Sequence, residues 1–281
     1  MNQPAKRRTT QGKPATPPAS KVKPKAKPDT PAAQTAAATT ATTRAAKAGK
    51  AVKAAPREPT VLHASGLTKQ YGDLVALAPL DLSVKPGEAV VLIGHNGSGK
   101  TTFLRMASGL LEVTEGQVFV NGAAAGSVEA RAGVSYLSDS PTFYDDLSVW
   151  EHLELTAGLH GVTDWEQHGA DLLDHLGLYE RADDLPSRFS RGLKQKASIA
   201  IGLIRPMSLL LVDEPFVGLD AAGKAALLEL FDTLHKDGVA LMVATHELEF
   251  VKRVQRCIAL RDGELIHDGP VDGIDVLGLV S

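Results

Sequence analysis

The sequence contains 281 residues, which is room for one sizeable domain and an appendage. The formal net charge of −3 hides an asymmetry, because residues 1–58 carry 13 Lys and Arg but two acids, a net +11, whereas the remainder carries −14. Residues 1–58 contain no aromatic residue, Leu or Ile, so they lack the apolar surface that would offset the entropy of ordering. We therefore predict a disordered basic tail rich in Ala, Pro and Lys over residues 1–58, and one domain over residues 59–281.

Targeting and membrane signals are weak or absent. A signal peptide needs a continuous apolar stretch after the charged start, which this sequence lacks, and the fit to a transit peptide is loose. The longest apolar runs, residues 208–212 and 239–244, are strand-sized and far short of the roughly 18 residues of a membrane span. The single cysteine, Cys257, permits no internal disulfide, which suits a reducing compartment.

The first half of the domain alternates strand and helix patterns. Residues 61–71 and 74–84 have strand character and are separated by a turn, and residues 89–93 form the unbroken apolar run of a buried strand. Apolar residues recur on one side of residues 101–111, which predicts a helix. Residues 116–122 are predicted to form a strand and a turn.

The hydrophobic pattern changes in the second half of the domain. Apolar residues recur at helical spacing from residue 141 to residue 188, which predicts a helical subdomain over about residues 141–192, inserted into an α/β core. The elements predicted after it are a helix at 193–204, a strand at 209–212, a helix at 225–234, a strand at 239–244 and a closing hairpin at 258–267. Strand–helix alternation predicts a mainly parallel sheet covered on both faces.

Residues 94–101 read GHNGSGKT and fit the P-loop pattern at every fixed position. Glycines let backbone N–H groups point at phosphate oxygens, and the helix that follows adds the positive end of its dipole. A chance glycine-rich turn is the alternative, but the preceding buried strand and the following amphipathic helix favour nucleotide binding. Lys100 would reach the outer phosphates and Thr101 would bind Mg²⁺. The candidate residues are Gly94, His95, Asn96, Gly97, Ser98, Gly99, Lys100, Thr101 and Thr102, among which His95 is interpreted as a spacer.

Two carboxylates, Asp213 and Glu214, end the apolar strand that lies 113 residues after the P-loop lysine. Asp213 at the strand tip would hold Mg²⁺, usually through water, and Glu214 would polarise the attacking water. The alternative interpretation is that Asp213 and Glu214 are two surface acids at a solvated strand end. The P-loop upstream makes this alternative a poor explanation.

The ordered series of motifs resembles the nucleotide-binding subunit of an ATP-binding cassette (ABC) transporter over about residues 61–268. This resemblance implies a P-loop NTPase core of the ABC type, with a mainly parallel sheet, an antiparallel β subdomain and the inserted helical subdomain. It implies that Tyr71 stacks on adenine and that His246 is the switch histidine, a catalytic residue placed to reach the γ-phosphate. It also implies that Ser190 and Gly192 of the signature SRGLKQ contact a nucleotide held by a partner subunit, and that Asp220 belongs to the loop after the second motif. Each of these residues has an alternative interpretation. Tyr71 could be an aromatic residue of a turn, His246 a buried histidine at a strand end, and Ser190 an ordinary helix N-cap.

Two positions depart from the family pattern. In the signature, Arg191 replaces a glycine and Leu193 a glutamine, a variant that resembles single-domain subunits serving exporters of the type two group. After the predicted strand 134–137 the family expects a glutamine, and Asp139 occupies that position. Asp139 is therefore a candidate Mg²⁺ ligand, with a plain surface loop acid as the alternative.

The resemblance predicts an ATP-binding and ATP-hydrolysing subunit of a membrane transporter, with export favoured over import. ATP and Mg²⁺ are the expected cofactors, and the expected partners are a second ABC subunit, identical or different, and a separate permease that docks largely on residues 141–188. The expected location is cytoplasmic, peripheral on the inner face of the cell membrane, with the basic tail near anionic lipid.

Two alternatives remain open at this point. A soluble ABC ATPase acting on ribosomes or nucleic acid is kept open by the basic tail, but the sequence has neither a second cassette nor a coiled-coil insertion, so nucleic acid is disfavoured as a partner. A non-hydrolysing regulatory binder is disfavoured by the intact Glu214 and His246.

Overall fold

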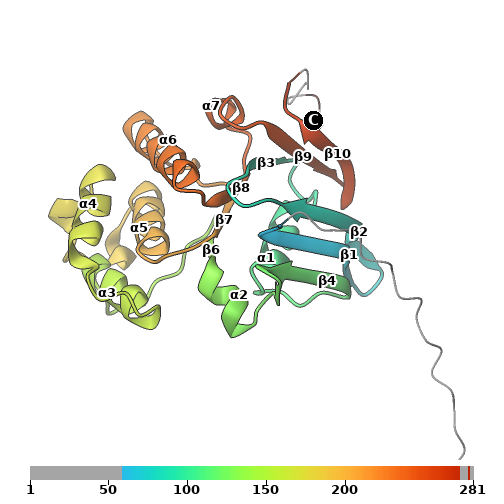
Figure 1. Ribbon diagram of the computed structural model, residues 1–281. Coiled ribbons are helices and arrows are strands. Elements are labelled where there is room, and N and C mark those ends of the chain that lie inside the picture. Colours follow the sequence, from blue (N-terminus) through green and yellow to red (C-terminus); the bar gives the residue numbers. More distant parts are fainter. Residues whose placement is uncertain (1–58, 273–277, 279–281) are drawn as a thin grey trace, which may run out of the picture. The chain divides into compact units, whose positions relative to one another are not determined.

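The computed structural model of the protein describes residues 59–272 and residue 278 (Figure 1). The predicted basic tail, residues 1–58, lies outside the described residues. None of the helices in the described part is both long and apolar enough to cross a bilayer.

A six-stranded sheet forms the centre of the domain, with the strand order β10-β9-β3-β8-β7-β6. Neighbouring strands from β9 to β6 run parallel, and β10 runs antiparallel to β9. The strands are β3 (Ala89–Ile93), β6 (Val134–Leu137), β7 (Leu209–Asp213), β8 (Ala240–Ala244), β9 (Arg256–Arg261) and β10 (Glu264–Pro270). The predicted mainly parallel sheet is confirmed.

A separate antiparallel sheet has the order β2-β1-β4-β5. It consists of β1 (Leu62–Tyr71), β2 (Leu74–Val84), β4 (Glu115–Val120) and β5 (Ala123–Ala124). The long β1 pairs with β2 on one side and with β4 on the other. The antiparallel β subdomain that the family resemblance implied is therefore present.

The central strands are buried on both faces, which explains their unbroken apolar sequences. Val91 and Ile93 of β3 pack into one hydrophobic core, whereas Val90 and Leu92 pack into another on the opposite face. The first core includes residues of α5 (Arg191–Leu203) and α6 (Ala221–Lys236), and the second includes residues of α1 (Lys100–Ala107) and the antiparallel sheet. Figure 1 shows these layers on the two sides of β7 and β8.

Short helices fill the segment between β6 and α5. They are α3 (Val149–Leu159), α4 (Glu166–His175) and the 3₁₀ turns η1 (Tyr179–Arg181) and η2 (Pro186–Arg188). Helix α3 begins in a capping box, because the Ser148 hydroxyl accepts from the Glu151 N–H and the Glu151 carboxylate accepts from the Ser148 N–H. Figure 1 shows α3 and α4 grouped beside α5, at the end of the domain away from the antiparallel sheet.

Several element ends differ from the sequence prediction. Helix α1 ends at Ala107, four residues before the predicted end, because Gly109 adopts a φ of 77° and the chain turns there. Helix α6 begins at Ala221, four residues before the predicted start, because the Asp220 side chain accepts from the Gly223 N–H and caps the helix. The short elements β5, α2 (Val128–Gly133) and α7 (Leu248–Val251) were not predicted, since they are too brief to show periodicity.

The first turn of α5 packs tightly against the loop that follows β7. A Cβ atom added to Gly192 would lie 2.4 Å from the carbonyl oxygen of Gly218, which is a backbone atom that cannot rotate away. By contrast, a Cβ atom added to Gly158 of α3 would meet nothing within 4 Å. The two glycines thus offer a matched pair of helical positions, one crowded and one open.

We expect Gly192→Ala to lower the free energy of unfolding by about 1–3 kcal/mol, the usual cost of overpacking. Gly158→Ala is the control and should leave stability unchanged or raise it by about 0.5–1 kcal/mol, because alanine favours the helix. Urea unfolding followed by circular dichroism measures both values. Equal midpoints for the two variants would contradict the close packing of α5 against residue 218.

Candidate nucleotide-binding site

The carboxyl ends of the parallel strands bring the candidate residues to one edge of the central sheet. The P-loop follows β3, Asp139 follows β6, Glu214 follows β7 and His246 follows β8. A pocket of about 240 Å³ lies at this edge and is lined by Ala76, Asn96, Gly97, Ser98, Gly99, Lys100, Thr101, Thr102, Asp139, Asp213 and Glu214. Residues separated by more than a hundred positions in the sequence are thus brought together.

The P-loop requires glycine at its first position. Gly94 has a φ of 152°, and a Cβ atom there would lie 2.2 Å from the Leu260 carbonyl oxygen and 2.5 Å from the Ser98 hydroxyl. The Ser98 hydroxyl is itself buried and has no hydrogen-bond partner in the described part of the chain. The first residue of the loop therefore packs closely against the Ser98 side chain of the same loop and the backbone of the neighbouring β9.

Lys100 is buried at the start of α1 and its ammonium group is directed at the loop. Its Nζ donates to the carbonyl oxygens of Gly94 at 2.6 Å and His95 at 3.1 Å. Burial lowers the pKa of Lys100, and the negative charges of Glu214 and Asp213 oppose that shift. The site therefore holds a confined cation that can bind phosphate oxygens.

His95 contacts the turn between β9 and β10. Its Nε2 lies 3.3 Å from Oδ1 of Asp262, and its Nδ1 lies 2.8 Å from the Asn96 carbonyl oxygen. His95 does not line the pocket of about 240 Å³. Its contacts link the P-loop to the β9–β10 hairpin, and the interpretation of His95 as a spacer stays a prediction.

Asp213 is the most buried carboxylate of the site, at 1% exposure. Burial raises its pKa, and a hydrogen bond with the Thr101 hydroxyl opposes that shift. One of its oxygens, Oδ2, is buried without a hydrogen-bond partner in the described part of the chain. Leaving a carboxylate oxygen buried and unpaired is costly, so the group fits a site completed by a cation.

The Thr101 hydroxyl and the Asp213 carboxylate are oxygen ligands of the kind that Mg²⁺ prefers. Among the described residues there is no group of three or more His, Cys, Asp or Glu side chains that could hold a metal ion by itself. Mg²⁺ in nucleotide sites is commonly held by one or two protein groups together with phosphate oxygens and water. The residues present fit that mode of binding.

Glu214 has a strained backbone and lies beside His246. Its φ of 46° is unusual for a residue with a side chain, and its N–H donates to the Ala244 carbonyl oxygen at 2.8 Å. Its Oε1 lies 3.3 Å from Nδ1 of His246. Burial raises the pKa of Glu214, while His246 and Lys100 oppose that shift. A carboxylate in this environment can accept a proton from water.

Asp139 is half-buried and lines the same pocket, with its Oδ1 accepting from the Ser138 hydroxyl at 3.1 Å. A second cation, Arg105, lies near Asp139, and the sequence analysis missed it. The nearby Tyr136 hydroxyl is the main cause that raises the pKa of Arg105, and the charges of Asp139 and Asp213 add to it. Arg105 follows Thr101 by four positions on α1, and this helical spacing was the signal that could have identified it.

The remaining candidates do not line the pocket. The Ser190 hydroxyl caps α5 by accepting from the Leu193 N–H, and Asp220 caps α6 and lies 3.6 Å from Nζ of Lys196. Tyr71 is 50% exposed at the end of β1, with Nζ of Lys69 at 4.9 Å from the centre of its ring. His246 and Glu214 border a separate open hollow of about 600 Å³ that includes residues 216–219.

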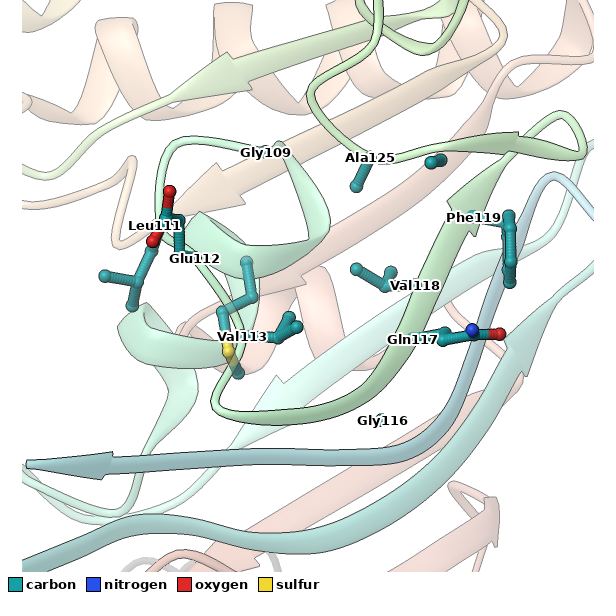
Figure 2. Close-up of a pocket in the computed structure, with 11 residues that line it drawn as sticks. Gly109, Leu111, Glu112, Val113, Gly116, Gln117, Val118, Phe119 and Ala125 are labelled. Carbon is teal, nitrogen blue, oxygen red and sulfur yellow. The ribbon is translucent and has the colours of Figure 1, made fainter. Parts of the chain in front are cut away.

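A larger cavity, of about 480 Å³, lies between the loop after α1 and strands β4 and β5 (Figure 2). Its lining is mostly aliphatic, with Val113 and Val118 among the residues that line it, and none of the residues 94–102 contributes to it. The cavity is therefore separate from the phosphate-binding loop.

Comparisons with known proteins agree with this geometry. Residues 77–217 match the family of ABC transporters. The chain is 34% identical over 211 residues to the SkfA peptide export ATP-binding protein SkfE of Bacillus subtilis, a match that covers 74% of this chain and 88% of the relative.

Solved structures give the same result. An ATP-binding subunit of an ABC transporter superposes with a TM-score of 0.72 at 30% identity, covering 76% of this chain and 91% of the other. A dimeric ATP-binding cassette in a post-hydrolysis state, bound to ADP and Pi, superposes with a TM-score of 0.69 at 26% identity, covering 76% of this chain and all of the other. This chain belongs to the ABC transporter family and is an ATP-binding cassette that hydrolyses ATP.

Proposed function

We propose that this chain is the ATPase subunit that powers a separate membrane permease, and that the transport is export. The observation that carries the proposal is a set of three charged residues in one pocket at the sheet edge, the buried Lys100 and Asp213 and the half-buried Glu214, in a chain similar to a peptide export protein. The signature variant with Arg191 and Leu193 supports export. The protein acts in the cytoplasm, at the inner face of the cell membrane.

The triphosphate binds along the P-loop. The backbone N–H groups of residues 94–102 and the Lys100 ammonium bind the phosphate oxygens, for which Lys100 exchanges its present contacts with loop carbonyls. Tyr71, exposed at the end of β1, stacks on the adenine ring. Thr101, Asp213 and Asp139 are the residues that would hold Mg²⁺ here. When bound, the ion neutralises charge on the phosphate oxygens.

Glu214 is the general base of hydrolysis. It accepts a proton from the water that attacks the γ-phosphorus, and its raised pKa brings its proton affinity closer to that required of a base near neutral pH. His246, 3.3 Å from the carboxylate, orients Glu214 and reaches the γ-phosphate.

A second subunit completes each site. Ser190, Gly192 and Asp220 lie outside the pocket of their own chain and are supplied by the partner cassette, identical or different. The N-terminus of α5, the positive end of the helix dipole, then meets the γ-phosphate. ATP binding closes the dimer and hydrolysis reopens it, and this cycle drives the permease. The basic tail, residues 1–58, contacts anionic lipid at the membrane surface.

Affinity purification of the full chain from detergent-solubilised native membranes tests the proposal. We expect an integral membrane protein to co-purify in a fixed ratio with the chain, and its presence to raise the ATPase rate. Recovery of the chain with ribosomes or nucleic acid, and not with a membrane protein, would support the rival class of soluble ABC ATPases.

We expect Glu214→Gln to retain ATP binding and to lose about 10²-fold or more of the ATPase rate, since the amide cannot accept the proton. The same change removes a negative charge near the γ-phosphate and should stabilise an ATP-bound dimer. Steady-state phosphate release and gel filtration with ATP measure these effects. Glu247→Gln is the control, because Glu247 is a nearby carboxylate that does not line the pocket. If the ATPase rate of Glu214→Gln were close to that of the parent, Glu214 would not be the general base.

We expect Asp139→Ala to lower the ATPase rate and its stimulation by the permease, while binding of nucleotide without Mg²⁺ stays nearly intact. The aspartate adds attraction to the cation and can accept a hydrogen bond from the attacking water. The exposed Asp237, outside the pocket and outside residues 141–188, gives the control, Asp237→Ala, which should behave as the parent. The measurement is the Mg²⁺ dependence of turnover with the permease present, and identical curves for both variants would exclude Asp139 from the site.

A further inference from the structure

Strand β1 ends at Tyr71, and this end of the strand is bonded to a loop that is distant in the sequence. The Thr114 N–H donates to the Thr68 carbonyl oxygen at 2.9 Å, and the Gln70 N–H donates to the Thr114 hydroxyl at 3.0 Å. Thr114 lies in the loop between α1 and β4. This loop therefore anchors the backbone next to Tyr71.

The side chain of Lys69 on β1 reaches the same loop. Lys69 is half-buried, and its Nζ donates to the carbonyl oxygen of Glu112 at 2.8 Å. Figure 2 shows Glu112 next to Leu111 in this loop, at the border of the cavity of about 480 Å³. The acceptor is a backbone atom, so its position depends on the path of the loop and not on a side-chain rotamer. The hydrogen bond thus holds the ammonium group of Lys69 in place.

The ammonium group of Lys69 also lies over the aromatic ring of Tyr71, with Nζ 4.9 Å from the ring centre. A cation within about 6 Å of the centre of an aromatic ring is attracted by the electron density of its face. Positions 69 and 71 project from the same face of β1, because successive side chains of a strand alternate. Tyr71 is nonetheless 50% exposed, so its ring still presents open surface to a ligand.

The Lys69–Tyr71 pair lies on the strand next to a wall of the nucleotide pocket. Ala76 of β2 lines the pocket of about 240 Å³. Leu77, which follows Ala76, pairs with Lys69 of β1. A nucleotide whose phosphates bind the P-loop can therefore extend past Ala76 toward the end of β1.

We propose that Lys69 is a positioning residue for nucleotide binding, which fixes the Tyr71 ring so that adenine stacks on the face that the ammonium group leaves open. This inference rests on the proposed stacking of adenine on Tyr71. A tyrosine at an exposed strand end can adopt several rotamers, and holding the ring in one of them before ATP arrives reduces the entropy lost on binding. Lys69 thus acts on the base through the ring and not on the phosphates.

Equilibrium titration of the full chain with ATP tests this role, in the absence of Mg²⁺ so that ATP is not hydrolysed. We expect Lys69→Met to raise the dissociation constant for ATP by about two- to fivefold, the effect of losing one cation–π contact at a partly exposed site. Inorganic tripolyphosphate has no base and should bind Lys69→Met and the parent equally. Lys236→Met, the same change at an exposed position outside the pocket, is the control and should bind ATP as the parent does.

Two further variants separate the charge of Lys69 from its hydrogen bond to the loop. Lys69→Gln keeps a donor without the charge and should lose as much affinity for ATP as Lys69→Met. Lys69→Arg keeps both the charge and a donor, so its dissociation constant should stay within about twofold of the parent value.

A double-mutant cycle isolates the contribution of the ring. Tyr71→Ala should raise the dissociation constant for ATP by about five- to a hundredfold, the range for the loss of base–aromatic stacking. Adding Lys69→Met to Tyr71→Ala should cause no further change, because the ring on which the lysine acts is absent.

The stacking proposal and the role of Lys69 fail in different ways. If Tyr71→Ala binds ATP as the parent does, the proposed stacking is wrong and the role of Lys69 falls with it. If Tyr71→Ala weakens binding but Lys69→Met and Lys69→Gln behave as Lys236→Met, only the role of Lys69 is overturned. That role is also overturned if Lys69→Met weakens ATP and tripolyphosphate equally, or weakens ATP binding further in the Tyr71→Ala background.

Discussion

A confined lysine beside one buried and one half-buried carboxylate is the constraint on which the nucleotide site depends. Lys100, Asp213 and Glu214 lie together in a pocket of about 240 Å³, where each charge is partly removed from water. Burial acts against the charged form of all three groups, and their mutual attraction offsets part of that cost. The buried Oδ2 of Asp213 without a partner indicates that the balance is completed from outside the chain.

The central sheet makes this arrangement possible. Parallel strands buried on both faces place all their carboxyl ends at one edge, so residues that follow β3, β6, β7 and β8 meet there. The strained φ of 46° at Glu214 is held by the hydrogen bond from its N–H to Ala244 on the neighbouring strand. The rigid sheet therefore sustains a backbone conformation that an isolated turn would not adopt.

Tyr136 lies in β6, two residues before Ser138 and three before Asp139. Its proximity is the main cause that raises the pKa of Arg105, and the charges of Asp139 and Asp213 add to that shift. Its side chain also lines a surface hollow of about 700 Å³ together with Arg131 and Arg205. Tyr136 therefore lies close both to the groups around Asp213 and to this hollow.

The sequence by itself determined the family, the P-loop and the strand that ends in Asp213 and Glu214. These features depend on local patterns, namely glycines at fixed positions and unbroken apolar runs, and such patterns can be read without knowing which segments meet. Strands β2 and β3 were predicted with the bounds that the structure gives. The end of α1 and the start of α6 were not, because a positive φ at Gly109 and a side-chain cap from Asp220 set them. Only the tertiary structure decided that Arg105 interacts with the charges of Asp139 and Asp213, and that His95 contacts Asp262. The same holds for Arg131, His160 and Arg205, which line one surface hollow whose lining contains no carboxylate. These contacts join residues from separate elements, and their geometry follows from the packing of the whole domain and not from any local pattern.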